Sequence, residues 1–188
     1  TLIPLWLFRV VPMQDIWQHL ALVDVSHHYD APGSVYPEFF VLPETPKANL
    51  FYYYVTHWIG LLTGDLEVAN KIVLSAYAIA LPLAYLFFLR SFGRSRWLAF
   101  FALPFVYGAM FSYGFVSFLL AMPMFFAGVG AYRRFVASPG PMPDLRWGGL
   151  AALALLALFF THAHVFLLTG LVCGLLFLMH RAAPWRMA

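Results

Sequence analysis

Long apolar runs alternate along the chain with short clusters of arginine. Three such runs, at residues 68–89, 97–132 and 147–179, are each followed by one of these clusters. As a continuous helix the second run would be about 54 Å long, whereas the hydrocarbon core of a membrane is about 30 Å thick. We therefore predict that this run folds back at residues 112–114. The third run is also too long for one crossing, and polar residues at 161–164 predict a second fold-back there.

These breaks predict an all-α polytopic membrane protein of about six transmembrane spans, folded as one transmembrane domain over residues 1–188. The spans are expected at residues 1–12, 68–89, 97–111, 115–132, 147–160 and 165–179. A single long tilted helix is the alternative for the last two spans. Residues 1–12 would extend only about 18 Å as a helix, so we interpret them as the exit half of a truncated first span. On this interpretation the sequence is truncated at both ends.

The charged residues divide between the two sides of this predicted bundle. Eight of the eleven Lys and Arg residues fall on one side, and six of the seven His and seven of the eight acidic residues fall on the other. The positive-inside rule makes the arginine-rich side cytoplasmic. The loop at residues 13–67 and the turn at 162–164 then face the exterior. We expect a multi-pass protein of the plasma (inner) membrane.

The composition also indicates a membrane protein, and it limits the kinds of partner that the chain is expected to bind. A chain of 188 residues with 63% hydrophobic residues, 10% charged residues and a mean hydropathy of +0.79 has too little polar surface for a soluble domain. The net charge of +3 comes from arginines that flank apolar runs, so we interpret them as topology determinants. We therefore expect membrane lipid as a partner and no nucleic acid. Cys173 is the only cysteine, which excludes an intrachain disulfide and a multi-cysteine metal site.

The exterior loop divides into three pieces. A helix is expected over 13–28, and at about 100° per residue it places Asp15 and His19 on one face. Four prolines and a glycine make residues 31–46 an irregular loop. Residues 49–63 carry an aromatic stripe and are too few to span a bilayer, so we expect a helix that lies in the headgroup layer.

Several polar residues are open to two interpretations. Asp15 and His19 are either an exposed helix pair or part of a functional site. The second interpretation is supported because an acidic side chain at the end of a span is costly if it enters lipid, and is more often functional when it faces a cavity. The His-His-Tyr-Asp run at 27–30 is typical of metal sites but also of solvated loops. His162 and His164 would diverge by about 200° on a helix and form a poor chelate. We expect no metal site and no cofactor, with a divalent metal as the open alternative.

The loop resembles the first exterior loop of the GT-C superfamily of polytopic membrane glycosyltransferases and its uncharacterised bacterial relatives. In that fold this loop opens with an acidic residue and contains helices that lie along the membrane. Asp15, within Gln-Asp-Ile-Trp-Gln-His-Leu at residues 14–20, is similar to that acidic position, and Asp15 to His19 is similar to an Asp-x-x-x-His pattern found there. Tyr36-Pro37, the aromatic helix at 49–63 and the short proline-bearing spans are also similar. The loop holds no Asp-x-Asp or Glu-x-Asp, which argues against a metal-dependent member.

The resemblance implies transfer of a sugar from a polyprenyl-phosphate donor at the exterior face. Asp15 and His19 would be catalytic, with Asp15 as the general base that deprotonates or orients the acceptor hydroxyl. The leaving phosphate needs cationic or hydrogen-bonding partners. The candidates for this substrate-binding role on the exterior side are Arg9, Lys47, Lys71, His162 and His164.

Three non-enzymatic classes compete with this interpretation: a transporter, a structural subunit and an exterior metal-binding protein. A transporter would place ionisable groups near the bilayer midplane, whereas the expected spans after the first contain almost none. This pattern disfavours an ion-coupled carrier. A structural membrane subunit and an exterior metal-binding protein, using the histidines of the loop and turn, remain as alternatives.

Overall fold

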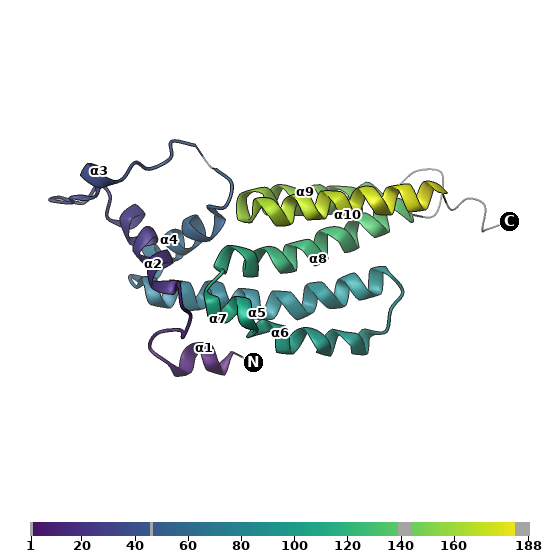
Figure 1. Cartoon of the computed structure of the whole chain (residues 1–188), viewed down its shortest axis with the longest axis horizontal. Coiled ribbons are helices and arrows are strands. Elements are labelled where there is room, and N and C mark those ends of the chain that lie inside the picture. Colours follow the sequence, from purple (N-terminus) through teal and green to yellow (C-terminus); the bar gives the residue numbers. More distant parts are fainter. Residues whose placement is uncertain (1, 46, 139–143, 183–188) are drawn as a thin grey trace.

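The computed structural model describes residues 2–45, 47–138 and 144–182, and this part of the chain is all-helical, with no strand. Long helices run along the main axis of the molecule, and α2 to α4 gather at one end of it (Figure 1). The elements are α1 (Ile3–Leu7), α2 (Ile16–His27), α3 (Tyr36–Phe39), α4 (Phe51–Thr63), α5 (Leu66–Ser91), the 3₁₀ helix η1 (Arg96–Ala102), α6 (Leu103–Val106), α7 (Ala109–Tyr113), α8 (Val116–Val136), α9 (Leu145–Thr161) and α10 (Ala163–Ala182). The predicted all-α class is confirmed.

Three helices are long and apolar enough to cross a membrane, namely α5, α8 and residues Ala163–His180 of α10. They indicate a membrane protein. Helix α9 is also apolar but has 17 residues. The prediction of six spans is not confirmed, because the expected first span contains only the five-residue α1 and the expected third span is divided among short helices.

The third expected span is divided by its proline and glycine. Pro104 lies in the first turn of α6, where its missing N–H would interrupt a continuous helix. Gly108 is extended at φ −74°, ψ −172° and separates α6 from α7. These pieces still run back along α5, since the Tyr77 hydroxyl donates to the Val106 carbonyl at 3.2 Å. The chain therefore returns to the end from which α5 began, but without one regular helix.

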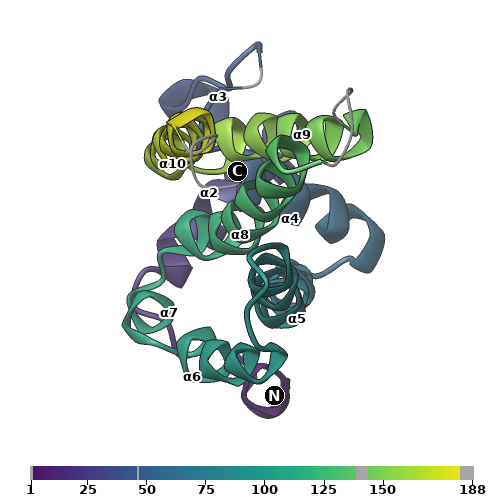
Figure 2. The same cartoon turned by 90° about the vertical axis from the view of Figure 1, so that its right-hand side faces the viewer.

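Both predicted fold-backs are confirmed. Gly114, in the left-handed region at φ +86°, ends α7, and α8 starts two residues later. His162 is extended at φ −160°, ψ 102° and separates α9 from α10. These two helices lie side by side in both ribbon views (Figures 1 and 2), and the rings of Phe159 and Phe166 are 5.7 Å apart. The alternative of one long tilted helix over 147–179 is therefore wrong.

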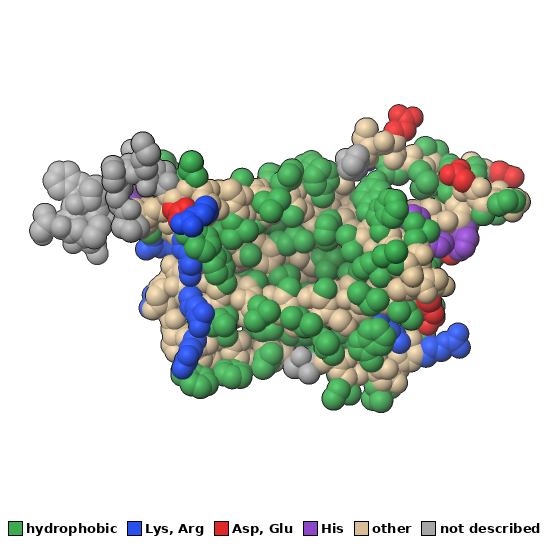
Figure 3. Space-filling model, turned by 180° about the vertical axis from the view of Figure 1, so that it is seen from behind, with side chains coloured by type: hydrophobic (Ala, Val, Ile, Leu, Met, Phe, Trp, Pro, Cys, Tyr) green, Lys and Arg blue, Asp and Glu red, His purple; other side chains and the backbone are tan. Residues whose placement is uncertain are grey.

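The two ends of the molecule carry different charged groups. Figure 3 shows most of the visible Lys and Arg gathered at one end, and most of the visible Asp, Glu and His gathered at the other. We name these the arginine end (Arg90, Arg94, Arg96, Arg133, Arg134 and Arg146) and the cap (residues 13–65, comprising α2, α3, α4 and their connections). The cap holds most of the acidic and histidine side chains, as the sequence pattern predicts.

The helices stack in layers, with α9 and α10 on one side of α8, and α5, η1 and α6 on the other (Figure 2). One hydrophobic core joins the cap to α5 and α8, because Ile16, Leu20 and Val23 of α2 pack in the same cluster as Leu74 of α5 and Leu119 of α8. The cap is therefore fixed to the helical bundle through shared side-chain packing.

A buried polar contact also joins the cap to α5. The Tyr52 hydroxyl donates to Oδ1 of Asn70 at 2.9 Å, and both side chains are almost fully inaccessible, at 0% and 2% exposure. A hydrogen bond between two buried groups contributes to stability mainly because either group without its partner would be buried with no hydrogen bond, to water or to protein. It therefore helps to fix the orientation of α4 on α5.

Replacing Tyr52 by Phe should lower the free energy of unfolding by about 1–3 kcal/mol, because Oδ1 of buried Asn70 would lose its donor. Tyr54→Phe is a matched control on the same helix, since Tyr54 is 38% exposed. We expect a melting temperature for Tyr54→Phe close to that of the parent protein in the same detergent. Equal melting temperatures for the two variants would contradict a stabilising role for the buried bond.

Candidate functional site

Asp15 lies at the start of α2 and is held there by its backbone. The N–H groups of Gln14 and Asp15 donate to the carbonyls of Ser112 and Tyr113, at 2.8 and 3.2 Å. Asp15 is the N-cap residue of α2, but its side chain makes no capping hydrogen bond. The half-buried carboxylate therefore makes no capping bond to its own helix.

His19 lies one turn further along α2 and is joined to α4. Its Nδ1 is 2.7 Å from the Tyr53 hydroxyl, and the Gly114 backbone forms a further hydrogen bond with the ring that raises the His19 pKa. The direction of the bond between His19 and Tyr53 follows the ring tautomer, and the Tyr53 hydroxyl donates when the ring proton is on Nε2. Burial lowers the pKa of His19 below its usual value, and the negative charge of Asp15 offsets part of this effect. Burial thus favours the neutral ring.

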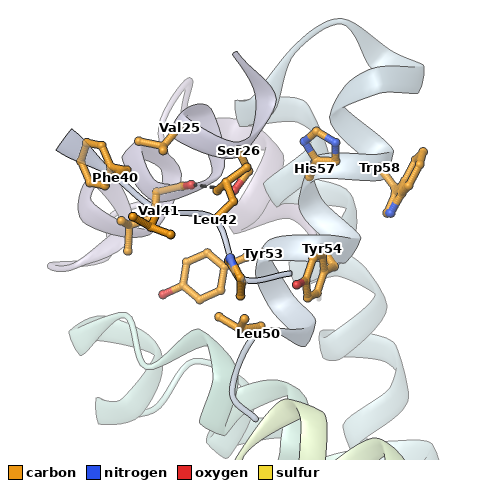
Figure 4. A pocket seen from close by; sticks show the side chains of 12 residues that line it. Val25, Ser26, Phe40, Val41, Leu42, Leu50, Tyr53, Tyr54, His57 and Trp58 are labelled. Carbon is orange, nitrogen blue, oxygen red and sulfur yellow. Dashed lines mark hydrogen bonds between the residues drawn. The ribbon is translucent and has the colours of Figure 1, made fainter. Parts of the chain in front are cut away.

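A cavity of about 480 Å³ opens beside Tyr53, between α2, the segment at residues 40–43, and α4 (Figure 4). We name it the aromatic cavity. All of its lining residues except Ser26 and His57 are apolar, Tyr or Trp. They are Leu22, Val25, Ser26, Phe40, Val41, Leu42, Pro43, Leu50, Tyr53, Tyr54, His57 and Trp58. Tyr53 therefore joins two features, since its ring lines the cavity and its hydroxyl contacts His19.

Two of the predicted phosphate ligands lie on another flank of the cap. Arg9 is exposed and its Nε is 3.9 Å from Glu67, while Nζ of Lys71 donates to the Phe8 carbonyl at 2.8 Å. Both line a polar pocket of about 500 Å³ together with Asp24, His27, His28, Gly64, Asp65, Leu66, Glu67 and Val68. Lys71 is buried and partly engaged, so Arg9 is the freer cation of the two. Lys47 lies exposed on the connection between α3 and α4.

His162 and His164 form the turn between α9 and α10, with ring centroids 5.8 Å apart. The Ala163 N–H between them donates to Oδ1 of Asn49 at 2.9 Å, which joins this turn to the start of α4. His162 also packs on Phe118, one turn into α8. Burial and the neighbouring His164 lower the pKa of His162. The turn therefore lies at the cap end of the bundle, where it contacts Asn49 just before α4 and Phe118 in the first turn of α8.

Three histidines form a row where α2 meets α4. The His27 ring centroid is 4.9 Å from that of His28 and 5.2 Å from that of His57. His28 is paired with Asp24 at 2.9 Å, and Nδ1 of His27 and of His57 are buried without a hydrogen-bond partner. Despite this proximity, no group of three His, Cys, Asp or Glu residues within the described ranges is placed to hold a metal ion.

Acidification should destabilise the folded cap. Burial lowers the pKa of His19 and His57, and a neighbouring histidine adds to this effect at His57. A histidine whose folded pKa is lowered stabilises the fold fully above its unfolded pKa of about 6.5, and this contribution is lost as the pH falls through the folded pKa. We expect a lower melting temperature at about pH 5.5 than at about pH 7.5, and a smaller difference in His57→Phe. A melting temperature independent of pH over this interval would contradict the prediction.

Sequence reasoning selected Asp15 and His19 but missed Tyr53. The structure brings His19 and Tyr53 together across two helices, whereas the sequence places them 34 residues apart. The available signal was the tyrosine run at residues 52–54, within an aromatic stripe whose favoured interpretation is a membrane anchor and whose alternative is a ligand platform. Trp58, Leu61 and Leu62 do face outward on α4, as an anchor would require.

Comparison with protein-family models, curated proteins and solved structures finds no match for this chain. The function must therefore be inferred from the chemistry of the site itself.

Proposed function

We propose that the protein is a membrane glycosyltransferase of the plasma (inner) membrane that transfers a sugar from a polyprenyl-phosphate donor to an acceptor hydroxyl at the exterior face. The observation that carries this proposal is the arrangement of Asp15, His19 and Tyr53. A carboxylate without a capping bond lies one helical turn before an imidazole whose pKa it influences, and the imidazole is hydrogen-bonded to the hydroxyl of a cavity-lining tyrosine. Such a set of groups is suited to general-base catalysis.

In the proposed reaction Asp15 and His19 act together as the base. The acceptor hydroxyl loses its proton to this pair as its oxygen attacks the anomeric carbon of the sugar. The bond from that carbon to the phosphate oxygen breaks, and the polyprenyl phosphate leaves with the electron pair. The Asp15 charge favours this step because it stabilises the imidazolium that forms at His19.

The donor phosphate needs a cationic partner, and Arg9 is the best placed on structural grounds because its side chain is exposed and only loosely paired with Glu67. Lys47 and Lys71 supply further positive charge at the cap. His162 and His164 serve as hydrogen-bonding groups, and burial favours the neutral form of His162 because it lowers the pKa of that ring. This division assigns proton transfer to α2 and phosphate recognition to the edge of the cap.

The experiment uses membranes that contain the full chain and polyprenyl phosphates carrying radiolabelled glucose or mannose. Loss of label from the lipid donor is compared between the parent protein and Asp15→Asn. Consumption of donor by the parent and not by the variant is the expected result. Equal consumption by both proteins, or by neither, would overturn the proposal and favour a non-enzymatic membrane protein.

A further inference from the structure

The acceptor of the proposed reaction is not specified by the catalytic groups, but the aromatic cavity restricts it. Its volume of about 480 Å³ is in the range of small-molecule sites. The lining offers mostly hydrocarbon and aromatic surface, with few polar groups. Such a cavity favours an apolar ligand segment over a free sugar, whose hydroxyl groups would lose their hydrogen bonds to water.

The rim of the cavity indicates where this ligand comes from. Val41 and Trp58, which line it, are 93% and 63% exposed, and Leu62 of the same helix as Trp58 is 86% exposed. Large apolar side chains at this exposure are costly in water and are favourable at a membrane surface, where tryptophan is enriched. The outward face of α4 thus continues the apolar surface of the cavity toward lipid.

The polar end of the cavity selects a hydrogen-bond donor. In the His19 tautomer with its proton on Nε2, the Tyr53 hydroxyl donates to Nδ1, and the lone pairs of the Tyr53 oxygen are then the acceptors for a ligand. A ligand hydroxyl can donate to this oxygen, whereas an ester or ketone cannot. Figure 4 shows the Tyr53 ring between Leu50 on one side and Val41 and Leu42 on the other. The hydrocarbon segment of a bound ligand would therefore lie against the ring.

We propose that the aromatic cavity binds the hydrocarbon segment of a membrane-derived lipid alcohol, with the hydroxyl of the lipid on the Tyr53 oxygen. This lipid alcohol is the acceptor class of the proposed transferase, and its assignment as acceptor rests on that function. As the acceptor oxygen bonds to the anomeric carbon and the polyprenyl phosphate leaves, the acceptor proton moves to the Tyr53 oxygen and the Tyr53 proton moves to His19, so no net charge is left on the tyrosine. Tyr53 is thereby a substrate-binding residue of the reaction.

The test uses the full chain in lipid vesicles with two photoreactive probes, a diazirine-bearing hexadecanol and the matching alkane without the hydroxyl. Crosslinked peptides are identified by mass spectrometry. We expect the alcohol to label the segment at residues 40–43 and helix α4. Leu42→Trp should fill the cavity and remove this labelling, and Leu22→Trp does the same from the α2 side if the first variant fails to fold.

Tyr53→Phe keeps the shape of the cavity and removes the hydroxyl. It should lower labelling by the alcohol about 2- to 10-fold, the range expected for one lost hydrogen bond, and leave labelling by the alkane unchanged. The intramembrane cavity between α5 and α8, lined by Phe105 and Met122, is an internal control that should label equally in every variant.

Three outcomes would overturn the inference. They are cap labelling that survives both tryptophan variants, equal labelling of the cap by the two probes, and an unchanged alcohol signal in Tyr53→Phe. Asp15→Asn separates this inference from the proposed function. It should leave labelling intact while abolishing donor consumption, so a failure of binding and a failure of catalysis give different results.

Discussion

Replacement of Asp15 by Asn is expected to reduce transfer of sugar from the lipid donor by about 100- to 10,000-fold, the usual contribution of a positioned base. The substitution keeps the size of the side chain and the backbone hydrogen bond to Tyr113. It removes the negative charge that favours protonation of His19 during the reaction. The measurement is the rate of label loss from polyprenyl phosphate-linked sugar at saturating donor.

Asp30→Asn is the matched control, because Asp30 is exposed on the same cap and undergoes the same chemical change. Its rate should equal that of the parent protein. A similar loss in both variants would mean that the overall negative charge of the cap, and not the position of Asp15, supports the reaction. Retention of a full rate in Asp15→Asn would remove Asp15 from the catalytic base.

Gly114→Ala is expected to lower the free energy of unfolding by about 2–5 kcal/mol, which combines backbone strain with a steric clash. Gly114 has φ +86°, a conformation that L side chains rarely adopt. An added Cβ would also lie 2.9 Å from the backbone nitrogen of Asp15, which cannot move aside as a flexible side chain could. The turn would therefore shift and carry Asp15 out of position.

Gly93→Ala separates the two causes. Gly93 has φ +65° but has nothing within 4 Å of the position where a Cβ would lie. This variant should lose only about 1 kcal/mol, from strain alone. Chemical unfolding in detergent compares the two. Equal losses would show that close packing of Gly114 on Asp15 adds nothing to stability.

The hydrophobic pattern was sufficient to predict the helical class and the fold-backs, because a bilayer limits the length of an apolar helix. Residues 112–114 and 161–164 are examples in which length and polar interruptions together located the turns. The third predicted span was wrong as a single helix because a hydropathy pattern does not distinguish one helix from several short pieces around Pro104 and Gly108. The expected first span holds only the short α1, and α3 lies within the expected irregular loop, whereas the bounds of α2, α4, α5, α8, α9 and α10 differ from the predicted ones by a few residues.

The candidate site was only partly accessible from sequence. Asp15 and His19 are one helical turn apart, so local periodicity places them together. Tyr53 and Gly114 reach His19 from other helices, and no local pattern encodes such contacts. The functional roles of Arg9, Lys47, Lys71, His162 and His164 stay predictions. Their positions divide them between two flanks of the cap, a division that charge counting did not anticipate.

The backbone bonds from Gln14 and Asp15 to Ser112 and Tyr113 have a consequence for biosynthesis. A growing chain exposes Asp15 long before the ribosome has made the turn that positions it. The bond from Ala163 to Asn49, 114 residues apart, is made later still. The start of α2 can therefore be fixed only after synthesis has reached Tyr113, and the contact of the α9–α10 turn with Asn49 can form only after Ala163 has been added.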